Sequence, residues 1–136
     1  MNVMEFVKLY LVALPIFFII DMFWLGVVAK GFYRKHLGYL MTPRVNWPAA
    51  IIFYLTFIAG VLIFVVIPAR NADSLWTAVV LGVLFGFFTY ATYDLTNLAT
   101  VKDWPLVVTI VDLCWGMVLS GSVAVLTFLL SNALKI

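Results

Sequence analysis

Charged residues are scarce in this chain of 136 residues, at 10% of the total against about a quarter in a typical soluble domain. Apolar residues make up 66% of the chain, and the mean hydropathy is +1.18. So little charge cannot give a folded domain of this size an ordinary water-facing surface. The composition therefore excludes a soluble globular protein and predicts an integral membrane protein.

An excess of positive charge is also missing, since eight Lys and Arg against six Asp and Glu leave a net charge of only +2. A nucleic-acid partner is therefore not expected. Cys114 is the only cysteine, so no internal disulfide can form, and His36 is the only histidine. The single histidine argues against a histidine-based metal centre or a catalytic triad, and we predict no metal site. No cofactor can be assigned from the sequence.

Four long apolar runs fill most of the chain, at about 6–29, 47–68, 75–98 and 105–130. Each is long enough to cross the hydrocarbon layer, which takes about 20 helical residues. We therefore predict an all-α polytopic membrane protein, an antiparallel bundle of four transmembrane helices forming a single membrane domain over 1–136. The first run is too long for a signal peptide and is expected to be retained. Pro15 is expected to kink or loosen it.

The loop at 30–46 is the most basic part of the chain, with Lys30, Arg34, Lys35 and Arg44 beside several aromatic residues. Positive loops stay in the cytoplasm, so this pattern predicts a cytoplasmic loop and both termini outside, in a bacterial cytoplasmic membrane. The aromatic residues indicate a short interfacial helix or turn whose basic side chains reach lipid headgroups. Membrane lipid is therefore an expected partner.

Asp21, Asp94 and Asp112 lie inside three different apolar runs, each about two helical turns from the end nearer the basic loop. An ionised aspartate deep in lipid costs about 2.5 to 3.5 kcal/mol, so such residues usually face a bundle interior or a water-filled cavity. One interpretation is that each acid accepts hydrogen bonds and only locks the helices together. Three acids at one depth favour a functional site instead, because clustered carboxylates repel one another.

Residues four positions apart share a helix face, and two such rows carry small residues ending in an acid. They are Gly82, Gly86, Tyr90 and Asp94 on one run, and Asp112, Gly116, Ser120 and Ala124 on another. Small residues let membrane helices approach closely. If the rows face each other, Asp94 and Asp112 meet at the end of the seam nearer the basic loop, with Asn97 close by.

Tryptophan follows two of the acids by three positions, in IIDMFWLG and IVDLCWGM, and the third lies in TYDLTNLATVKDWP. Over nearly its whole length the chain resembles domain-of-unknown-function family 2177 of small bacterial integral membrane proteins. The stretch from Tyr93 to Thr100 is the most specific part of the likeness. The resemblance implies a four-helix membrane fold and carries no catalytic roles. Its gene associations with fatty-acid modification and stress favour a lipid-like ligand.

These observations predict a polar pocket on the cytoplasmic side that binds, and in one version modifies, a lipid-like or amphipathic small molecule. The predicted ligand-binding residues are Asp21, Trp24, Tyr90, Tyr93, Asp94, Asn97, Asp112 and Trp115. No nucleophile–base set stands out, so whether the protein is an enzyme stays open. Carboxylates with Asn97 holding Mg²⁺ for a phosphorylated substrate is a further alternative.

Two other function classes fit the same sequence. Protonatable acids within a small bundle are typical of a proton-coupled transporter or an oligomeric channel, and one copy of this size would then act as a homo-oligomer. Short loops and 17% aromatic residues also fit a non-catalytic accessory subunit of a larger membrane complex. Flux that is lost in Asp94→Asn would identify a transporter, and a fixed protein partner would identify a subunit.

Overall fold

The computed structural model describes residues 1–136 and is entirely helical apart from its connections. The elements are α1 (Val3–Phe23), η1 (Trp24–Val28), α2 (Lys30–Leu37), α3 (Trp47–Val61), η2 (Leu62–Val66), α4 (Ile67–Asn71), α5 (Leu75–Thr100) and α6 (Leu106–Ala133). Four continuous helical segments are long and apolar enough to cross a membrane: Val3–Val28, Trp47–Asn71, Leu75–Thr100 and Leu106–Ala133. The predicted all-α bundle with four membrane-spanning helices is confirmed.

Side chains at the helix starts explain where three of the spans begin. Asn2 and Glu5 form a reciprocal capping box at α1, in which each side chain accepts a hydrogen bond from the other residue's backbone N–H. Asn46 accepts from the third residue of α3, and Ser74 accepts from Thr77 at the start of α5. Pro105 directly precedes α6, where its missing N–H costs no hydrogen bond.

Wide turns occur in the first two spans, and the pattern of apolar residues did not predict them. In η1 and η2 the backbone closes five-residue π turns, as in the 2.7 Å bond from Ala29 N to Trp24 O. η2 ends two residues before Pro68, and the helix continues to Asn71 rather than ending at Pro68 as the sequence suggested. α1 passes through Pro15 without interruption, so its loosened turn lies at Trp24–Val28 and not at the proline.

α5 and α6 form the closest helix pair, and glycine makes this approach possible. Gly82 lies opposite Gly121, and Gly86 lies opposite Gly116, so the two helices run antiparallel with their backbones nearly in contact. A methyl group added at Gly86 would overlap the Gly116 carbonyl, and one added at Gly82 would lie 2.8 Å from the Gly121 Cα. The small-residue rows predicted from the sequence therefore do face each other.

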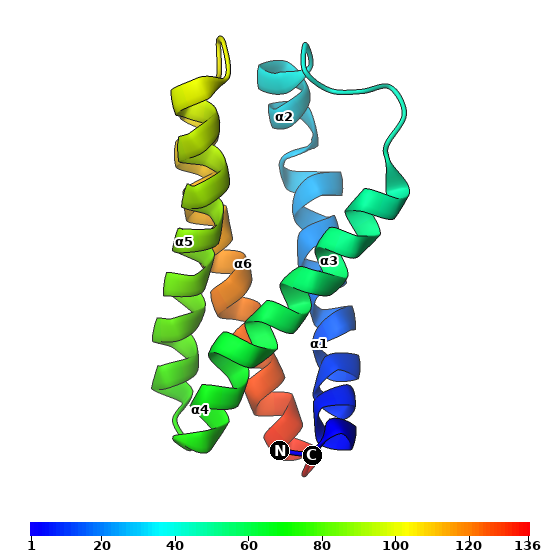
Figure 1. Ribbon diagram of the computed structural model, residues 1–136, viewed down its shortest axis with the longest axis vertical. Helices are drawn as coiled ribbons and strands as arrows, with labels where there is room; N and C mark the ends of the chain where they lie inside the picture. Colours follow the sequence, from blue (N-terminus) through cyan, green and yellow to red (C-terminus); the bar gives the residue numbers. More distant parts are fainter.

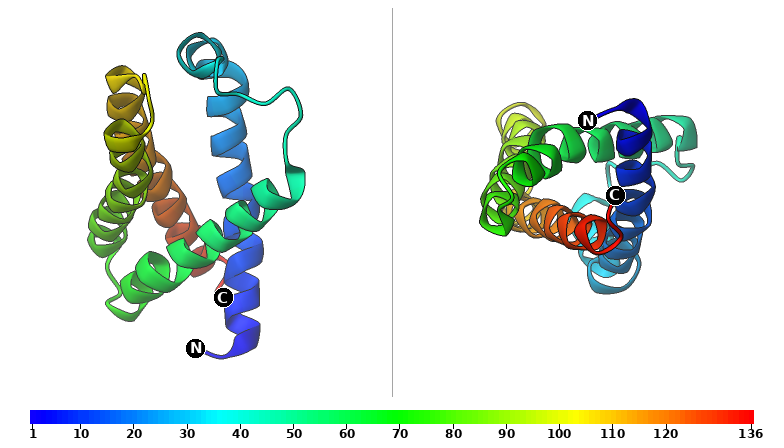
Figure 2. Two further views of the ribbon diagram at one scale, coloured as in Figure 1. Left: turned by 45° about the horizontal axis from the view of Figure 1, so that its top comes forward. Right: turned by 90° about the horizontal axis from the view of Figure 1, so that it is seen from below.

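α1 packs against α6, whereas α3 runs across from α6 between α1 and α5 (Figure 1 and Figure 2), and aromatic side chains join α3 to α1. Phe17 contacts Tyr54 and Phe57 with ring centroids 5.6 and 5.7 Å apart, and the Tyr10 hydroxyl donates a 2.7 Å hydrogen bond to the Leu55 carbonyl. α3 crosses α1 obliquely (Figure 1). Toward the end that carries α2, α1 separates from the α5–α6 pair (Figure 2). The bundle is thus tight at one end and wider at the other.

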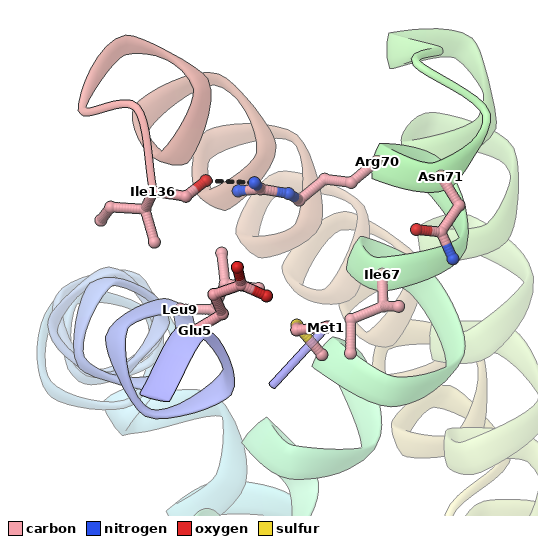
Figure 3. A pocket seen from close by; sticks show the side chains of 7 residues that line it. All are labelled: Met1, Glu5, Leu9, Ile67, Arg70, Asn71 and Ile136. Carbon is pink, nitrogen blue, oxygen red and sulfur yellow. Dashed lines mark hydrogen bonds between the residues drawn. The ribbon is translucent and has the colours of Figure 1, made fainter. Parts of the chain in front are cut away.

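The two ends of the bundle differ in what they hold. The basic loop and the α5–α6 connection share the wide end, where the Tyr39 hydroxyl donates to the Asp103 carbonyl at 2.6 Å. Both chain termini lie at the narrow end, where the Arg70 guanidinium donates to the Ile136 carbonyl (Figure 3). A cavity of about 240 Å³ lies beside Arg70 and Glu5 at this narrow end.

We predict that Gly86→Ala destabilises the bundle by about 1 to 3 kcal/mol or more, because its methyl group would displace the backbone of α6. Gly31→Ala is the matched control, since nothing lies within 4 Å of a methyl group there. It should be neutral or stabilising by less than about 1 kcal/mol. Thermal unfolding in detergent micelles measures both, and equal stabilities would contradict the seam.

Candidate functional site

The three aspartates of the spans all lie on the wide half of the bundle and are buried. Asp21 is 5% exposed on α1, Asp94 is fully buried on α5, and Asp112 is 6% exposed on α6. Asp94 lies six residues before the end of α5 and Asp112 lies six residues after the start of α6 at Leu106, so the antiparallel pairing brings them to one level. The depth expected from counting residues agrees with this arrangement.

Asp112 is held by a tyrosine from outside the spans. The Tyr33 hydroxyl on α2 donates a short hydrogen bond to Asp112 Oδ1, and the same hydroxyl accepts a 3.2 Å bond from Trp24 Nε1. Burial and the neighbouring Asp112 carboxylate raise the pKa of the Tyr33 hydroxyl, so it stays a protonated donor. This chain of bonds fixes α2 against both α6 and the wide turn η1.

The two tryptophans that follow the acids stack on each other. Trp24 and Trp115 lie with ring centroids 4.4 Å apart and ring planes 7° apart. The Trp24 indole projects from the first residue of the wide turn η1, directly after the end of α1. Trp115 Nε1 is buried without a hydrogen-bond partner, although the Asp21 carboxyl and the Tyr54 hydroxyl are close neighbours. The repeated Asp-x-x-Trp pattern thus builds one shared wall from two helices.

A cavity of about 200 Å³ opens beside this wall, and we call it the aromatic cavity. Its lining residues come from η1, α2 and four spans: Asp21, Trp24, Leu25, Tyr33, Phe53, Tyr54, Tyr90, Asp112 and Trp115. Six of the nine are aromatic and two are acids, and none is Lys or Arg. The cavity therefore offers electron-rich ring faces and carboxyl oxygens without a basic side chain.

A second cavity of about 600 Å³, the outer cavity, lies between α3 and α5 and reaches α6. Its lining residues are Phe53, Phe57, Thr89, Tyr90, Thr92, Tyr93 and Asp112. Phe53, Tyr90 and Asp112 line both cavities, so the two adjoin. Phe53 and Tyr93 are more than half exposed at its rim, and the outer cavity is therefore open at the surface of the bundle.

Asp94 occupies the seam rather than either cavity. Both of its carboxyl oxygens are buried without a hydrogen-bond partner, and the Asp112 carboxyl faces it. Thr109 donates a long 3.4 Å bond to the Asp94 backbone carbonyl and accepts one from Trp104 Nε1 at 3.1 Å. An unpartnered buried carboxyl costs free energy, so Asp94 is a strained point of the α5–α6 contact.

Of the eight residues proposed from the sequence, the structure brings six to the two cavities. Asp21, Trp24, Tyr90, Asp112 and Trp115 line the aromatic cavity, and Tyr93 joins Tyr90 and Asp112 at the outer cavity. Asp94 lies behind Asp112, and Asn97 lies one turn beyond, next to Tyr93 and lining neither cavity. No group of three His, Cys, Asp or Glu side chains is placed to hold a metal ion.

The sequence did not single out three aromatic residues that line the aromatic cavity. Tyr33 comes from the basic loop, and Phe53 and Tyr54 come from the span without charge. One signal was present for Tyr33. α2 is a short amphipathic helix whose basic residues face water, so its aromatic residues are expected to pack against an apolar surface. Phe53 and Tyr54 are not distinguishable by pattern from packing residues of any apolar helix.

We predict that Tyr33→Phe lowers stability by about 1.5 to 3 kcal/mol, because a hydrogen bond to a buried carboxyl is lost. It should also weaken the near-ultraviolet circular dichroism signal of the stacked Trp24 and Trp115 indoles. Tyr39→Phe is the control, since it removes an exposed hydrogen bond at the same end of the bundle. Retention of the signal and the stability in Tyr33→Phe would refute the proposed role of the hydroxyl.

Comparison with known families places the chain among membrane proteins. Residues 6–129 match a family model described as a predicted membrane protein, DUF2177. No curated protein and no solved structure matches the chain. The matched region includes nearly all of the four spans and every residue of both cavities. The chain therefore belongs to the DUF2177 family of predicted membrane proteins, as the resemblance of its sequence indicated.

Proposed function

We propose that this membrane protein binds an amphipathic, membrane-soluble small molecule in its two adjoining cavities. The observation that carries the proposal is that Phe53, Tyr90 and Asp112 line both cavities, so that a smaller cavity with two acids adjoins a larger one. The polar end of the ligand would lie against Asp112 and Asp21. Its apolar part would lie along Phe57 in the outer cavity.

The depth of the cavities supports a ligand that dissolves in the membrane. The outer cavity is bordered by two spans, and its rim residues Phe53 and Tyr93 belong to the long apolar segments of α3 and α5. A ligand that enters between two spans would come from the bilayer rather than from water. A concave site with many aromatic residues and a few polar groups is the usual form of a small-molecule pocket.

The ligand should be seen as a bound mass when the full chain is extracted gently and examined by native mass spectrometry. Thr92→Trp should remove it, because Thr92 lines the outer cavity and its side chain is exposed there. Leu129→Trp adds the same ring to an exposed position of α6 that lines neither cavity, and it should retain the ligand. Asp112→Asn should weaken retention.

Equal retention of the bound mass in Thr92→Trp and Leu129→Trp would contradict the proposal. A fixed protein partner without any bound small molecule would favour the accessory-subunit alternative instead. Flux of protons or solute through liposomes would favour the transporter alternative.

We also propose that the wide end of the bundle faces the cytoplasm and that both described termini face outward in a bacterial cytoplasmic membrane. Five of the eight basic residues belong to the two loops of that end: Lys30, Arg34, Lys35, Arg44 and Lys102. The Tyr39–Asp103 hydrogen bond joins these two loops, which supports their lying on one side. Positive loops are retained in the cytoplasm.

We predict that a cysteine at Thr42 is protected from a membrane-impermeant maleimide in intact cells, whereas one at Asp73 reacts. Both variants are made on a Cys114→Ala background, because Cys114 is the only native thiol. The two positions are exposed and lie in connections at opposite ends of the bundle, so they form a matched pair. Labelling at Thr42→Cys alone would reverse the orientation.

A further inference from the structure

The side chains that line the aromatic cavity favour a positively charged ligand. Trp24 and Trp115 present indole rings, Tyr33, Tyr54 and Tyr90 present phenol rings, and two acids lie among them. The face of an aromatic ring is electronegative and attracts a cation within about 6 Å, with tryptophan the strongest partner. The aromatic rings and the carboxylates of this cavity therefore both attract a cation.

Asp21 lines the aromatic cavity together with Asp112. It is 5% exposed, and no Lys or Arg side chain lines the cavity to neutralise it. Asp112 differs, because one of its oxygens already accepts the Tyr33 hydroxyl. Beside Asp21 the buried Trp115 Nε1 also lacks a partner. The neighbours of Asp21 are thus neutral donors, Trp115 and Tyr54, and no cationic side chain of the cavity is paired with it.

Anionic head groups fit this cavity poorly. A phosphate, sulfate or carboxylate would face two carboxyl groups and the electronegative faces of five indole and phenol rings, with no basic side chain to offset the repulsion. A neutral hydroxyl could bond to Asp21 but would gain little from the rings. A positively charged nitrogen gains from both the rings and the acids.

The size of the cavity limits the cation to a compact group. A volume of about 200 Å³ is roughly seven times the 30 Å³ share of one water molecule in the liquid, which suits a head group of a few non-hydrogen atoms. The outer cavity of about 600 Å³ shares Phe53 and Tyr90 with it and has the volume to accommodate an alkyl chain. The two volumes together match a small head on a longer tail.

We propose that the aromatic cavity binds an alkylammonium head group, so that the ligand of this protein is a long-chain amine or quaternary ammonium amphiphile. The inference rests on the proposed function, because it specifies the head group of the molecule that the two cavities hold. Asp21 pairs with the cationic nitrogen, the stacked Trp24–Trp115 pair provides one free ring face, and the alkyl chain lies in the outer cavity.

Three probes with the same alkyl chain test this proposal on the full chain in maltoside micelles: tetradecyltrimethylammonium, tetradecanol and tetradecyl sulfate. Native mass spectrometry and tryptophan emission report saturable binding. We expect the ammonium to bind about tenfold or more tightly than the alcohol, and the sulfate to show no saturable binding. This ranking is measured on the unaltered protein and needs no variant to fold.

Variants then locate the site. Asp21→Asn and Trp115→Leu should each weaken ammonium binding about fivefold or more while leaving alcohol binding less affected. Asp73→Asn and Trp76→Leu are matched controls, because both residues are exposed and line neither cavity. Neither control should alter the affinity for the ammonium.

The outcomes separate this inference from the proposed function. Equal binding of the ammonium and the alcohol, with both lost in Thr92→Trp, would overturn the ammonium assignment and retain an amphiphile site. Preferred binding of the sulfate would also overturn it. No saturable binding of any probe would overturn both proposals together.

Discussion

Carboxyl groups withdrawn from water must find donors within the protein, and this requirement organises the wide half of the bundle. Each of α1, α5 and α6 buries one aspartate, and the three carboxyl groups differ in the donors that surround them. Asp112 receives the Tyr33 hydroxyl, and Asp21 has the Trp115 indole and the Tyr54 hydroxyl beside it. Asp94 has no hydrogen-bond partner and faces Asp112 alone. The aromatic cavity lies beside two of these acids, Asp21 and Asp112.

The glycine seam fixes the positions of two of these acids. Because Gly82 and Gly86 let α5 lie almost against the backbone of α6, Asp94 is trapped between the helices while Asp112 is turned toward α2 and α3. A looser seam would admit lipid or water between the two carboxyl groups. Close packing therefore does more than stabilise the pair, since it decides which acid reaches the cavities and which does not.

Much of the fold could be predicted because membrane spans are long and their small residues recur every fourth position. Length and apolarity indicated four spans, and the rows of small residues ending at Asp94 and Asp112 indicated the α5–α6 contact. The walls of the cavities were harder to predict. Tyr33 reaches Asp112 only because α2 turns back over the end of the bundle, and Phe53 contributes only because α3 crosses obliquely. Such contacts depend on tertiary packing, and no local pattern encodes them.

The position of α2 links the membrane surface to the bundle interior. Its basic residues Arg34 and Lys35 are exposed on the surface of the protein, while Tyr33 on the same short helix forms the hydrogen bonds with Asp112 and Trp24. If α2 moved away from the bundle, Asp112 and Trp24 would both lose their hydrogen bond with the Tyr33 hydroxyl. This eight-residue helix thus joins an exposed basic surface to a buried acid of the bundle through a single tyrosine side chain.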